Sequence, residues 1–472
     1  MDRLLQGVEV VGTVGDPSSA EVTSVELDHH AVHPGALFCC VVGEHHDGHD
    51  FAAAAVEAGA VGLLVERQLP LAVPQAVVPA GRMRLVMAAL SAALYGNPSE
   101  SLLMVGVTGT NGKTTVTHLL GAVLDAHGLP CEVIGTLRGP RTTPESPALQ
   151  RHLAEARDDG CRAVAMEVSS HALVAGRVEG IEFAAAVFTN LSQDHLDFHG
   201  DMESYFGAKA ALFQPGRSRL GVVSADDQWG RRLLAQAEIP MVPFSTEEAT
   251  EVEVDAAHTA FTWRHRRVVL QLAGSYHVAN ALAAATTASA LGVPMDTIVA
   301  GLAAAEPVPG RFEIVPTDAP FTVVVDYAHT PGGLAGALHS ARALAAGRGG
   351  RVLCVFGCGG ERDAGKRPDM GRVAVAGADV VVVTSDNPRS EDPTAIIEQV
   401  LAGIPERSAV TVEPDRRAAI VAAVEAAGPG DVVVVAGKGH ERSIEVGGAS
   451  LPFDDRHEAA AAVAARVAGT RP

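Results

Sequence analysis

The chain has 472 residues, 47% of them hydrophobic and 19% charged, so its composition is that of a folded globular protein and its length predicts two to four domains. With 36 basic against 56 acidic residues, the net charge of −20 repels nucleic acids and anionic lipid surfaces and argues against partners of either kind. The six cysteines form no Cys-x-x-Cys motif, and neither a signal peptide nor a membrane-spanning apolar stretch occurs, so we expect a cytoplasmic protein with reduced thiols.

The first part of the chain alternates short apolar runs with Gly and Pro turns and carries a helical stretch at residues 51–59. A cluster of turn-forming residues at 95–99 predicts the end of this part. We therefore expect a small N-terminal α/β domain at residues 1–98.

Strand-like apolar runs alternate with helical patterns over the rest of the chain, which predicts mainly parallel sheets. In the middle part these runs lie at 102–107, 163–168, 184–191 and 221–224. A Pro- and Gly-rich segment at 306–310 marks a second boundary; Val-rich runs follow at 322–325, 352–356, 380–384 and 431–436, and a closing helix at 458–468. We expect a central domain with a P-loop ATPase-like parallel sheet at 99–308 and a Rossmann-like domain at 309–472.

One glycine-rich segment lies between a predicted strand and a predicted helix, and it reads Gly109-Thr110-Asn111-Gly112-Lys113-Thr114-Thr115. Backbone N–H groups at such a helix N-terminus bind phosphate, Lys113 adds positive charge for the outer phosphates, and the Thr114 hydroxyl suits Mg²⁺. The motif is a variant, because a strict P-loop has glycine where this chain has Val107. A turn that only connects a strand to a helix is the alternative. We expect all seven residues to bind ATP.

Three further places carry polar side chains next to predicted strands or inside an apolar helix. Glu167 ends the strand-like run at 163–166, where a carboxylate beside a phosphate loop is placed to hold a metal. Segment 190–200 contributes Asp194, His195, Asp197 and His199, which are candidate metal ligands or acid–base groups, with structural hydrogen bonds as the alternative. Lys209 lies in an apolar helix at 205–213, which requires it to be modified, paired or extended toward solvent.

Together these segments resemble the Mur ligases, the family that builds the peptide stem of peptidoglycan. The resemblance rests on GTNGKTT at 109–115, MEVSSHAL at 166–173, FTNLSQDHLDFHG at 188–200, AKAALF at 208–213, DYAHTP at 326–331 and VFGCGGERDAGKRP at 355–368. It covers essentially the whole chain, in order. It implies a three-domain Mur ligase architecture and an ATP-dependent, ADP-forming ligase, acting as a cytoplasmic monomer on small molecules.

The resemblance also implies roles for individual residues. Lys209 would be carbamylated and, with Thr114, Glu167 and His195, would hold Mg²⁺, while Lys113 completes the catalytic set. Asn280 and Asp326 would contact ATP. The precursor would be UDP-N-acetylmuramoyl-alanyl-glutamate, and its implied contacts are Leu27, Thr142, Thr143, Ser169 and Arg177.

The amino acid to be added is indicated by Asp386-Asn387-Pro388-Arg389, which follows the strand-like run at 380–384. A plain turn is the alternative for this sequence. Within the family this segment resembles the signature of ligases that add meso-diaminopimelate. An Arg guanidinium can bind the distal carboxylate of diaminopimelate, and it would repel the ammonium group that lysine has at that end. Arg362, Gly437 and Glu441 would complete this pocket.

The chain departs from the family pattern at His29-His30, Ala175, His277 and Glu361, which concerns the substrates more than the type of reaction. The histidines 29, 30, 33, 45, 46 and 49 suggest either a metal or pH-sensing cluster or surface histidines in loops; we favour the latter because carboxylate and Cys partners are absent from the pattern. Two alternatives for the function stay open: a ligase for lysine or another amino acid, and a non-catalytic nucleotide-binding paralogue.

Overall fold

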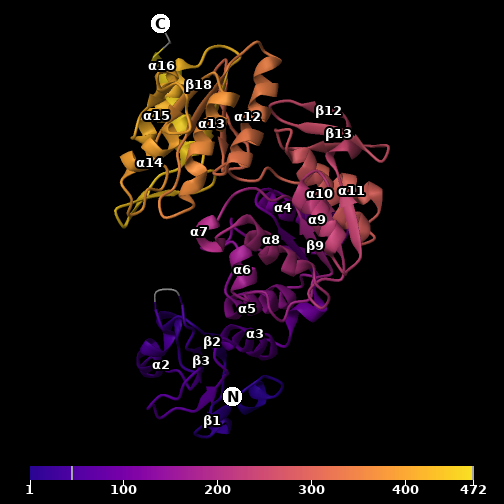
Figure 1. The fold of residues 1–472 in the computed structure, drawn as a ribbon. Coiled ribbons are helices and arrows are strands. Elements are labelled where there is room, and N and C mark those ends of the chain that lie inside the picture. Colours follow the sequence, from indigo (N-terminus) through magenta and orange to yellow (C-terminus); the bar gives the residue numbers. More distant parts are fainter. Residues whose placement is uncertain (44–45, 470–472) are drawn as a thin grey trace. The chain divides into compact units, whose positions relative to one another are not determined.

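The structure is a computed structural model that describes residues 1–43 and 46–469. The chain forms two compact units: unit one comprises Met1–Gly106, Leu129–Ala186 and Ala211–Leu220, and unit two comprises Val107–Gly128, Val187–Ala210 and Gly221–Pro472. Figure 1 shows the elements of each unit. The boundaries expected at 98/99 and 308/309 stay predictions.

The N-terminal sheet of unit one has five strands in the order β1-β5-β4-β3-β2, of which only the β1–β5 pair is antiparallel. Its strands are β1 (Gly12–Val14), β2 (Ser24–Glu26), β3 (Ala36–Cys39), β4 (Gly62–Val65) and β5 (Gln75–Val77). Side chains alternate between its faces: Leu37 packs with helix α3 (Met83–Leu94), and Phe38 packs with α2 (Ala52–Glu57). A short helix α1 (Asp2–Leu5) precedes the sheet.

The remainder of unit one pairs β7 (Cys131–Ile134) in parallel with β8 (Ala163–Glu167) and carries α5 (Ser146–Asp158) and α6 (Ser170–Val174). Strands β6 (Leu103–Thr108) and β9 (Ala185–Phe188) begin in unit one and end in unit two. Backbone bonds from Leu103 to Arg162 and from Ala184 to Met104 join β6 to segments on either side of it. Two of the three places where the chain passes from unit one to unit two therefore lie in neighbouring strands, β6 and β9.

Unit two begins where β6 runs through the glycine-rich segment into α4 (Lys113–Ala126), against which α10 (His277–Ala290) and α11 (Met295–Ala304) pack. Helices α7 (Leu196–His199), α8 (Met202–Ala210) and α9 (Gln228–Gln236) and the parallel pair β10 (Gly221–Ser224) and β11 (Met241–Phe244) belong to it as well. An antiparallel sheet of β12 (Thr250–Val254), β13 (Thr259–Trp263) and β14 (Arg266–Leu270) was not predicted from the sequence.

The C-terminal sheet has the order β15-β16-β20-β17-β18-β19, parallel except for the β15–β16 pair. Its strands are β15 (Glu313–Val315), β16 (Thr322–Asp326), β17 (Val352–Phe356), β18 (Val380–Val383), β19 (Val410–Val412) and β20 (Val432–Ala436). Helices α12 (Pro331–Ala346), α13 (Arg367–Gly377) and α14 (Pro393–Leu401) cover one face, and α15 (Arg416–Ala426) and α16 (Asp455–Gly469) cover the other. Because both faces are buried, the strands are runs of valine.

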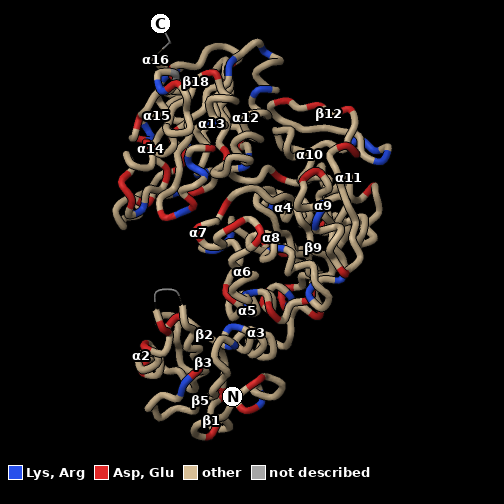
Figure 2. The backbone as a smooth tube through the Cα atoms, in the orientation of Figure 1, with Lys and Arg blue, Asp and Glu red and all other residues tan. Residues whose placement is uncertain are grey.

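A two-stranded hairpin, β21 (Ser443–Val446) and β22 (Ala449–Pro452), follows β20. The 3₁₀ helices are η1 (Pro17–Ser19), η2 (His29–Ala31), η3 (Gly48–Phe51), η4 (Pro98–Ser101), η5 (Ala211–Phe213), η6 (Thr246–Glu248), η7 (Ala364–Lys366) and η8 (Arg407–Ala409). Figure 2 shows that acidic and basic residues are interspersed over both units. Among the described residues, no helix is long and apolar enough to cross a membrane. The predicted α/β fold class is confirmed.

The core of the C-terminal sheet provides a test of the fold. Leu338 on α12 is 1% exposed and belongs to that core, whereas Leu451 on β22 is 51% exposed. We expect Leu338→Ala to lower the free energy of unfolding by about 2–5 kcal/mol, because it removes a packed side chain and leaves a cavity. The same change at Leu451 should cost within about 0.5 kcal/mol. Urea unfolding of the two variants measures both, and equal losses would contradict the assignment of this core.

Candidate functional site

The glycine-rich segment approaches its neighbours so closely that two of its glycines have no substitute. A Cβ on Gly109 would lie 1.9 Å from the Thr189 Oγ1, and one on Gly112 would lie 2.5 Å from the Asn280 Oδ1. Both glycines have positive φ, 142° and 90°. The turn therefore presents bare backbone at the N-terminus of α4, which is the arrangement that binds phosphate.

Lys113 begins α4 and lies over this turn. Its Nζ donates to the carbonyl oxygens of Gly109, at 3.0 Å, and Thr110, at 2.9 Å. Thr114 and Thr115 follow it and are buried. The positive charge, the helix N-terminus and the backbone N–H groups thus lie at one place, as a triphosphate requires.

A cavity of about 380 Å³ opens beside the turn, within the size range of small-molecule sites. Six of the residues predicted to bind ATP line it, namely Asn111, Gly112, Thr114, Thr115, Asn280 and Asp326. The wall also contains residues that were not predicted, among them Tyr276, Arg311 and Tyr327. Segments more than 200 residues apart in the sequence therefore meet around one space.

Asp326, at the end of β16, is held by three hydrogen bonds. Its Oδ2 accepts from the Tyr276 hydroxyl at 2.8 Å and from the Phe312 backbone N–H at 2.6 Å, and its Oδ1 accepts from Ala328 at 2.7 Å. Burial raises the pKa of this carboxyl, and these hydrogen bonds and the Arg311 charge oppose the rise. Asp326 thus fixes the wall of the cavity by orienting Tyr276.

Arg311 is the cavity residue whose omission matters most. Its Nη2 donates to the Thr114 Oγ1 at 2.8 Å, and its guanidinium lies 4.5 Å from the centre of the Tyr327 ring. Arg311 directly follows residues 306–310, which the sequence predicted to be a domain boundary, and it was not predicted as a site residue. A single arginine after Pro-Gly carries no local signature, because its partners are distant in the chain.

Lys209 is buried in α8, with 1% of its surface exposed. Its Nζ donates to the Gly109 carbonyl oxygen at 2.8 Å and lies 4.7 Å from the centre of the Tyr205 ring. Burial, together with the nearby Lys113 charge, lowers the pKa of this amine well below its usual range. A neutral amine is the form that reacts with CO₂, so the surroundings of Lys209 fit its proposed carbamylation.

His195 lies in the left-handed region, with φ 55°, and its Nε2 is 3.3 Å from the Asp194 Oδ2. The Asp194 Oδ1 accepts from Lys366 at 2.8 Å, and His329 is 3.7 Å from its other oxygen. Burial alone would raise the pKa of Asp194, but the His329 hydrogen bond and the Lys366 charge outweigh it and hold the pKa well below its usual range. Asp194 is therefore an anion that links the loop after β9 to the C-terminal sheet's loops.

The predicted metal ligands divide between the two units. Thr114, His195 and Lys209 lie in unit two, and Glu167 lies in unit one. The Glu167 Oε1 accepts from the Thr136 backbone N–H at 2.9 Å. A threonine hydroxyl, a carboxylate and a carbamate supply the oxygen ligands that Mg²⁺ prefers, so three of the four donors fit the metal, whereas the His195 imidazole is a nitrogen donor. Their joint coordination stays a prediction.

The predicted precursor contacts lie in unit one, and four of the five gather near the end of β8. The Thr143 Oγ1 donates to the Glu167 carbonyl oxygen at 2.9 Å, and the Ser169 backbone N–H donates to Thr143 at 3.1 Å. Arg177 donates to the Thr143 carbonyl at 3.3 Å. Thr142 is 3.1 Å from Thr136, which also contacts Glu167. Leu27 lies apart from them in sequence and packs against the core of the N-terminal sheet.

The predicted amino-acid contacts lie on loops that follow β17, β18 and β20. The Asn387 Oδ1 accepts from the buried Lys438 at 2.9 Å, and its Nδ2 donates to the Glu441 Oε2 at 2.8 Å. Asp386 is buried, and a Cβ on Gly437 would lie 2.2 Å from its Oδ2. These four residues, with Lys438, form one interlocked set.

Two arginines lie beside this set. A Cβ on Gly359 would lie 3.2 Å from the Arg389 Nη1 and 3.9 Å from the Arg362 Cγ, so both side chains pass the same point. Arg389 has a φ of 54° and donates to the Gly360 carbonyl oxygen at 2.5 Å. Arg362 is exposed. Pro388 accepts through its carbonyl from Glu391 at 3.0 Å, which closes the turn.

The histidines of the N-terminal domain correct the sequence interpretation in two respects. His49 is buried rather than on the surface, because its Nδ1 bonds the Asp47 carboxylate at 2.6 Å and its Nε2 accepts from the Glu66 backbone at 3.0 Å. Carboxylate partners are also present: Asp28 groups with His29 and His30, and their possible ligand atoms lie within 4.8 Å of one another.

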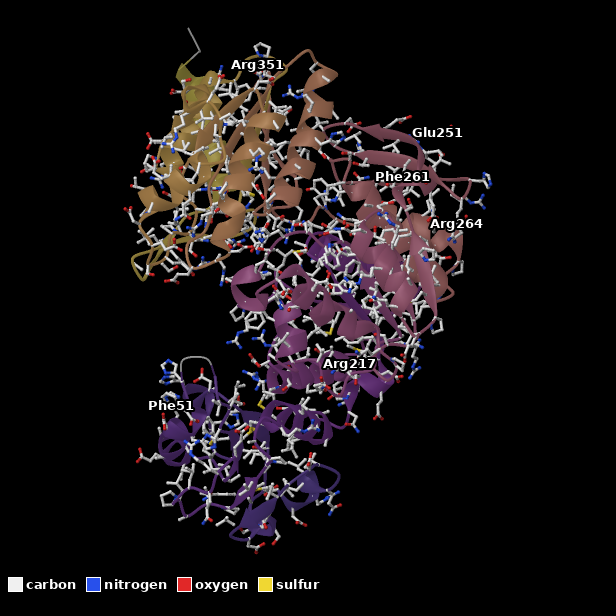
Figure 3. All side chains as sticks on the ribbon, viewed as in Figure 1. Phe51, Arg217, Glu251, Phe261, Arg264 and Arg351 are labelled. Atoms are coloured by element: carbon white, nitrogen blue, oxygen red, sulfur yellow. The ribbon has the colours of Figure 1, made fainter. Side chains whose placement is uncertain are left out.

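Figure 3 labels Phe51, the ring on which His29 stacks with 4.7 Å between centroids. His46 meets the same ring edge-on, at 6.0 Å. His33 contacts the Pro34 carbonyl at 3.3 Å, and His45 lies outside the described residues. Aromatic packing and hydrogen bonds thus explain most of these histidines.

Three models of the Mur ligase family match the chain: the Mur ligase middle domain at residues 107–288, the glutamate ligase domain at 310–439 and the catalytic domain at 21–95. A UDP-N-acetylmuramoyl-L-alanyl-D-glutamate–2,6-diaminopimelate ligase from Streptomyces coelicolor is 44% identical over 96% of this chain and 94% of its own. A protein of the same name from Geobacillus thermodenitrificans is 44% identical over 94% and 96%.

Solved structures are similar to this chain over most of its length. One ligase of that name is 32% identical with a TM-score of 0.63, covering 94% of this chain and 95% of its own. MurF from Thermotoga maritima in complex with ADP has a TM-score of 0.66 at 20% identity, over 94% of this chain and 97% of its own, which shows the shared fold. The three-domain Mur ligase architecture expected from the sequence is confirmed.

Carbamylation of Lys209 has a direct spectroscopic test. We expect protein equilibrated with ¹³C-bicarbonate to show a carbamate carbon signal, because burial lowers the pKa of this amine and so favours its neutral form. Lys209→Met should abolish the signal. Lys438→Met is the matched control and should retain the signal, because it removes a buried lysine whose Nζ bonds Asn387 and Glu441 and leaves Lys209 in place. A signal that survives Lys209→Met would contradict the assignment.

His277 makes stability depend on pH. Burial lowers its pKa from 6.5 to about 3, so between these values the unfolded state binds a proton that the folded state does not. Stability therefore falls as the pH drops below 6.5, by about 2 kcal/mol at pH 5. We expect the stability of His277→Asn to lose this part of its pH dependence. His339→Asn, which changes an exposed histidine, should retain the pH dependence of the wild type. Urea unfolding at pH 7 and pH 5 compares them; equal pH dependence in wild type and His277→Asn would contradict it.

Proposed function

Because the chain belongs to the Mur ligase family, we propose that it joins meso-2,6-diaminopimelate to the glutamate carboxylate of UDP-N-acetylmuramoyl-L-alanyl-D-glutamate at the expense of ATP. The observation that carries the substrate assignment is the interlocked set around Asn387 and Glu441, with Arg389 beside it. Relatives that are 44% identical over nearly the whole chain bear the name of this activity. The reaction belongs to the cytoplasmic synthesis of peptidoglycan precursors, and the protein acts as a monomer.

A carboxylate does not react with an amine by itself, since its leaving group would be an oxide. Bound ATP with Mg²⁺ supplies the phosphoryl group that converts it into an acyl phosphate, which an amine attacks. The chain's own part is binding and charge: the turn at 109–112 and Lys113 bind the phosphates, and Arg311 adds a second cation at the cavity. No residue is needed as a covalent nucleophile.

The amino-acid site has charges that match diaminopimelate. Glu441 offers a carboxylate to an ammonium group, because the Lys438 charge and the hydrogen bonds from Lys438 and Asn387 outweigh burial and keep its pKa below the usual value. Arg389 offers a guanidinium to the distal carboxylate, which lysine lacks. Lysine would instead place an ammonium against Arg389. The lysine alternative is therefore disfavoured by charge.

The function and its selectivity are tested by phosphate release from ATP with the purified protein and the muramoyl dipeptide precursor. We expect turnover with meso-diaminopimelate and little with lysine at equal concentration. Arg389→Ala should lower kcat/KM for diaminopimelate by about 100-fold, the equivalent of about 3 kcal/mol for charge-assisted hydrogen bonds. Arg407→Ala is the control, because it removes an exposed arginine that pairs with Glu398 at 2.9 Å. It should leave kcat/KM unchanged.

Other outcomes separate the alternatives. Turnover with lysine alone would overturn the role of Arg389 and leave the ligase activity standing. ATP binding without turnover of either amino acid would favour the non-catalytic paralogue.

A further inference from the structure

The hairpin β21–β22 is attached to the amino-acid site by its backbone rather than by a core. All eight residues of its two strands are partly or fully exposed. The Arg389 N–H donates to the Glu445 carbonyl oxygen at 2.9 Å, and the Gly447 N–H donates to the Arg389 carbonyl oxygen at 2.7 Å. The Glu445 N–H donates to the Asn387 Oδ1 at 3.0 Å. The hairpin is thus held in register with the Asp386–Arg389 turn.

This register places the Glu445 side chain against the Arg389 guanidinium. The Arg389 Nε is 3.0 Å from the Glu445 Oε2, and its Nη1 donates to the Gly360 carbonyl oxygen. A guanidinium has five N–H donors, so two are engaged and three remain for a ligand. The two acceptors come from different loops, and together they fix the plane of the guanidinium.

We infer that Glu445 is a positioning residue of the amino-acid site, which orients Arg389 so that its remaining donors face the distal carboxylate of the amino acid. This inference rests on the proposed function. A long arginine side chain loses rotamer entropy when it is fixed, and here Glu445 and Gly360 fix it before the amino acid binds. None of the motifs that indicate the substrate contains Glu445.

Charge alone would give the opposite effect, since the Glu445 carboxylate repels the carboxylate of the amino acid. The geometry favours positioning. Glu445 contacts Nε and leaves both Nη2 donors unassigned, and its side chain is 50% exposed, so water screens its charge. The effect of Glu445 on the orientation of Arg389 acts through the 3.0 Å contact and is retained, whereas solvent weakens the repulsion between Glu445 and the carboxylate of the amino acid.

The experiment measures steady-state kinetics of Glu445→Ala with varied meso-diaminopimelate. We expect KM for diaminopimelate to rise about fivefold, the size of an exposed charge-assisted pair, with kcat and KM for ATP unchanged. Glu445→Gln keeps an acceptor for Nε and should restore most of the loss. The matched control is Glu398→Ala, which removes a 55% exposed glutamate from its pair with Arg407 at 2.9 Å and should change nothing.

A second background tests whether Glu445 acts through Arg389. In Arg389→Lys the Nε contact is gone, so adding Glu445→Ala should have no further effect on KM. An unchanged or lower KM in Glu445→Ala, or an equal rise in both backgrounds, overturns the inference. If the wild-type protein does not turn over diaminopimelate, the proposed function and this inference fail together. If the wild-type protein is active and the variants behave otherwise than expected, only this inference fails. Thermal unfolding of each variant shows that the fold is intact.

Discussion

The buried ion pair between Asp194 and Lys366 is the contact on which the site of unit two most depends. Its 2.8 Å hydrogen bond joins the loop after β9 to the segment before α13, 172 residues later. Both side chains are less than 10% exposed, so removing either leaves a buried charge without its partner, at a cost of about 3–5 kcal/mol. The pair therefore specifies how the loop after β9 and the C-terminal sheet are joined, since a shifted arrangement would separate the charges.

Lysine is rare in this chain, and its few ammonium groups lie at particular places. The chain has four lysines, Lys113, Lys209, Lys366 and Lys438, and all four lie in the sites described above. Arginine supplies the exposed ion pairs elsewhere, as in Arg407 with Glu398. An ammonium is a compact charge whose pKa shifts readily on burial, whereas a guanidinium stays charged. A net charge of −20 is therefore compatible with the proposed anionic substrates, because the few compact cations lie at the predicted ATP and amino-acid sites.

The sequence predicted those parts of the site that are local in the chain. The turn at 109–115 is a contiguous motif between a strand and a helix, so phosphate binding could be predicted from its residues. The Asp386–Arg389 segment is also contiguous, and its predicted role rests on the resemblance to the Mur ligases. Arg311 could not, because its partner Thr114 is 197 residues away. The sheet β12–β14 was missed because its outer strand reads Thr-Glu-Val-Glu-Val and is largely exposed, which gives no buried apolar run. His49 was misjudged because its burial depends on Asp47 and the Glu66 backbone.

The order of the C-terminal sheet explains why the predicted amino-acid site can be assembled from three separate loops. Strands β20, β17 and β18 are adjacent and parallel, so the loops at their carboxyl ends meet at one edge. Gly359 follows β17, Arg389 follows β18, and Glu441 follows β20, and none of them lies within a strand. Changes of substrate can therefore arise in these loops while the valine-rich strands beneath stay the same. The positive φ of Arg389 fits this division, because the hydrogen bonds from Gly447 and to Glu445 hold a strained residue that a free loop would release.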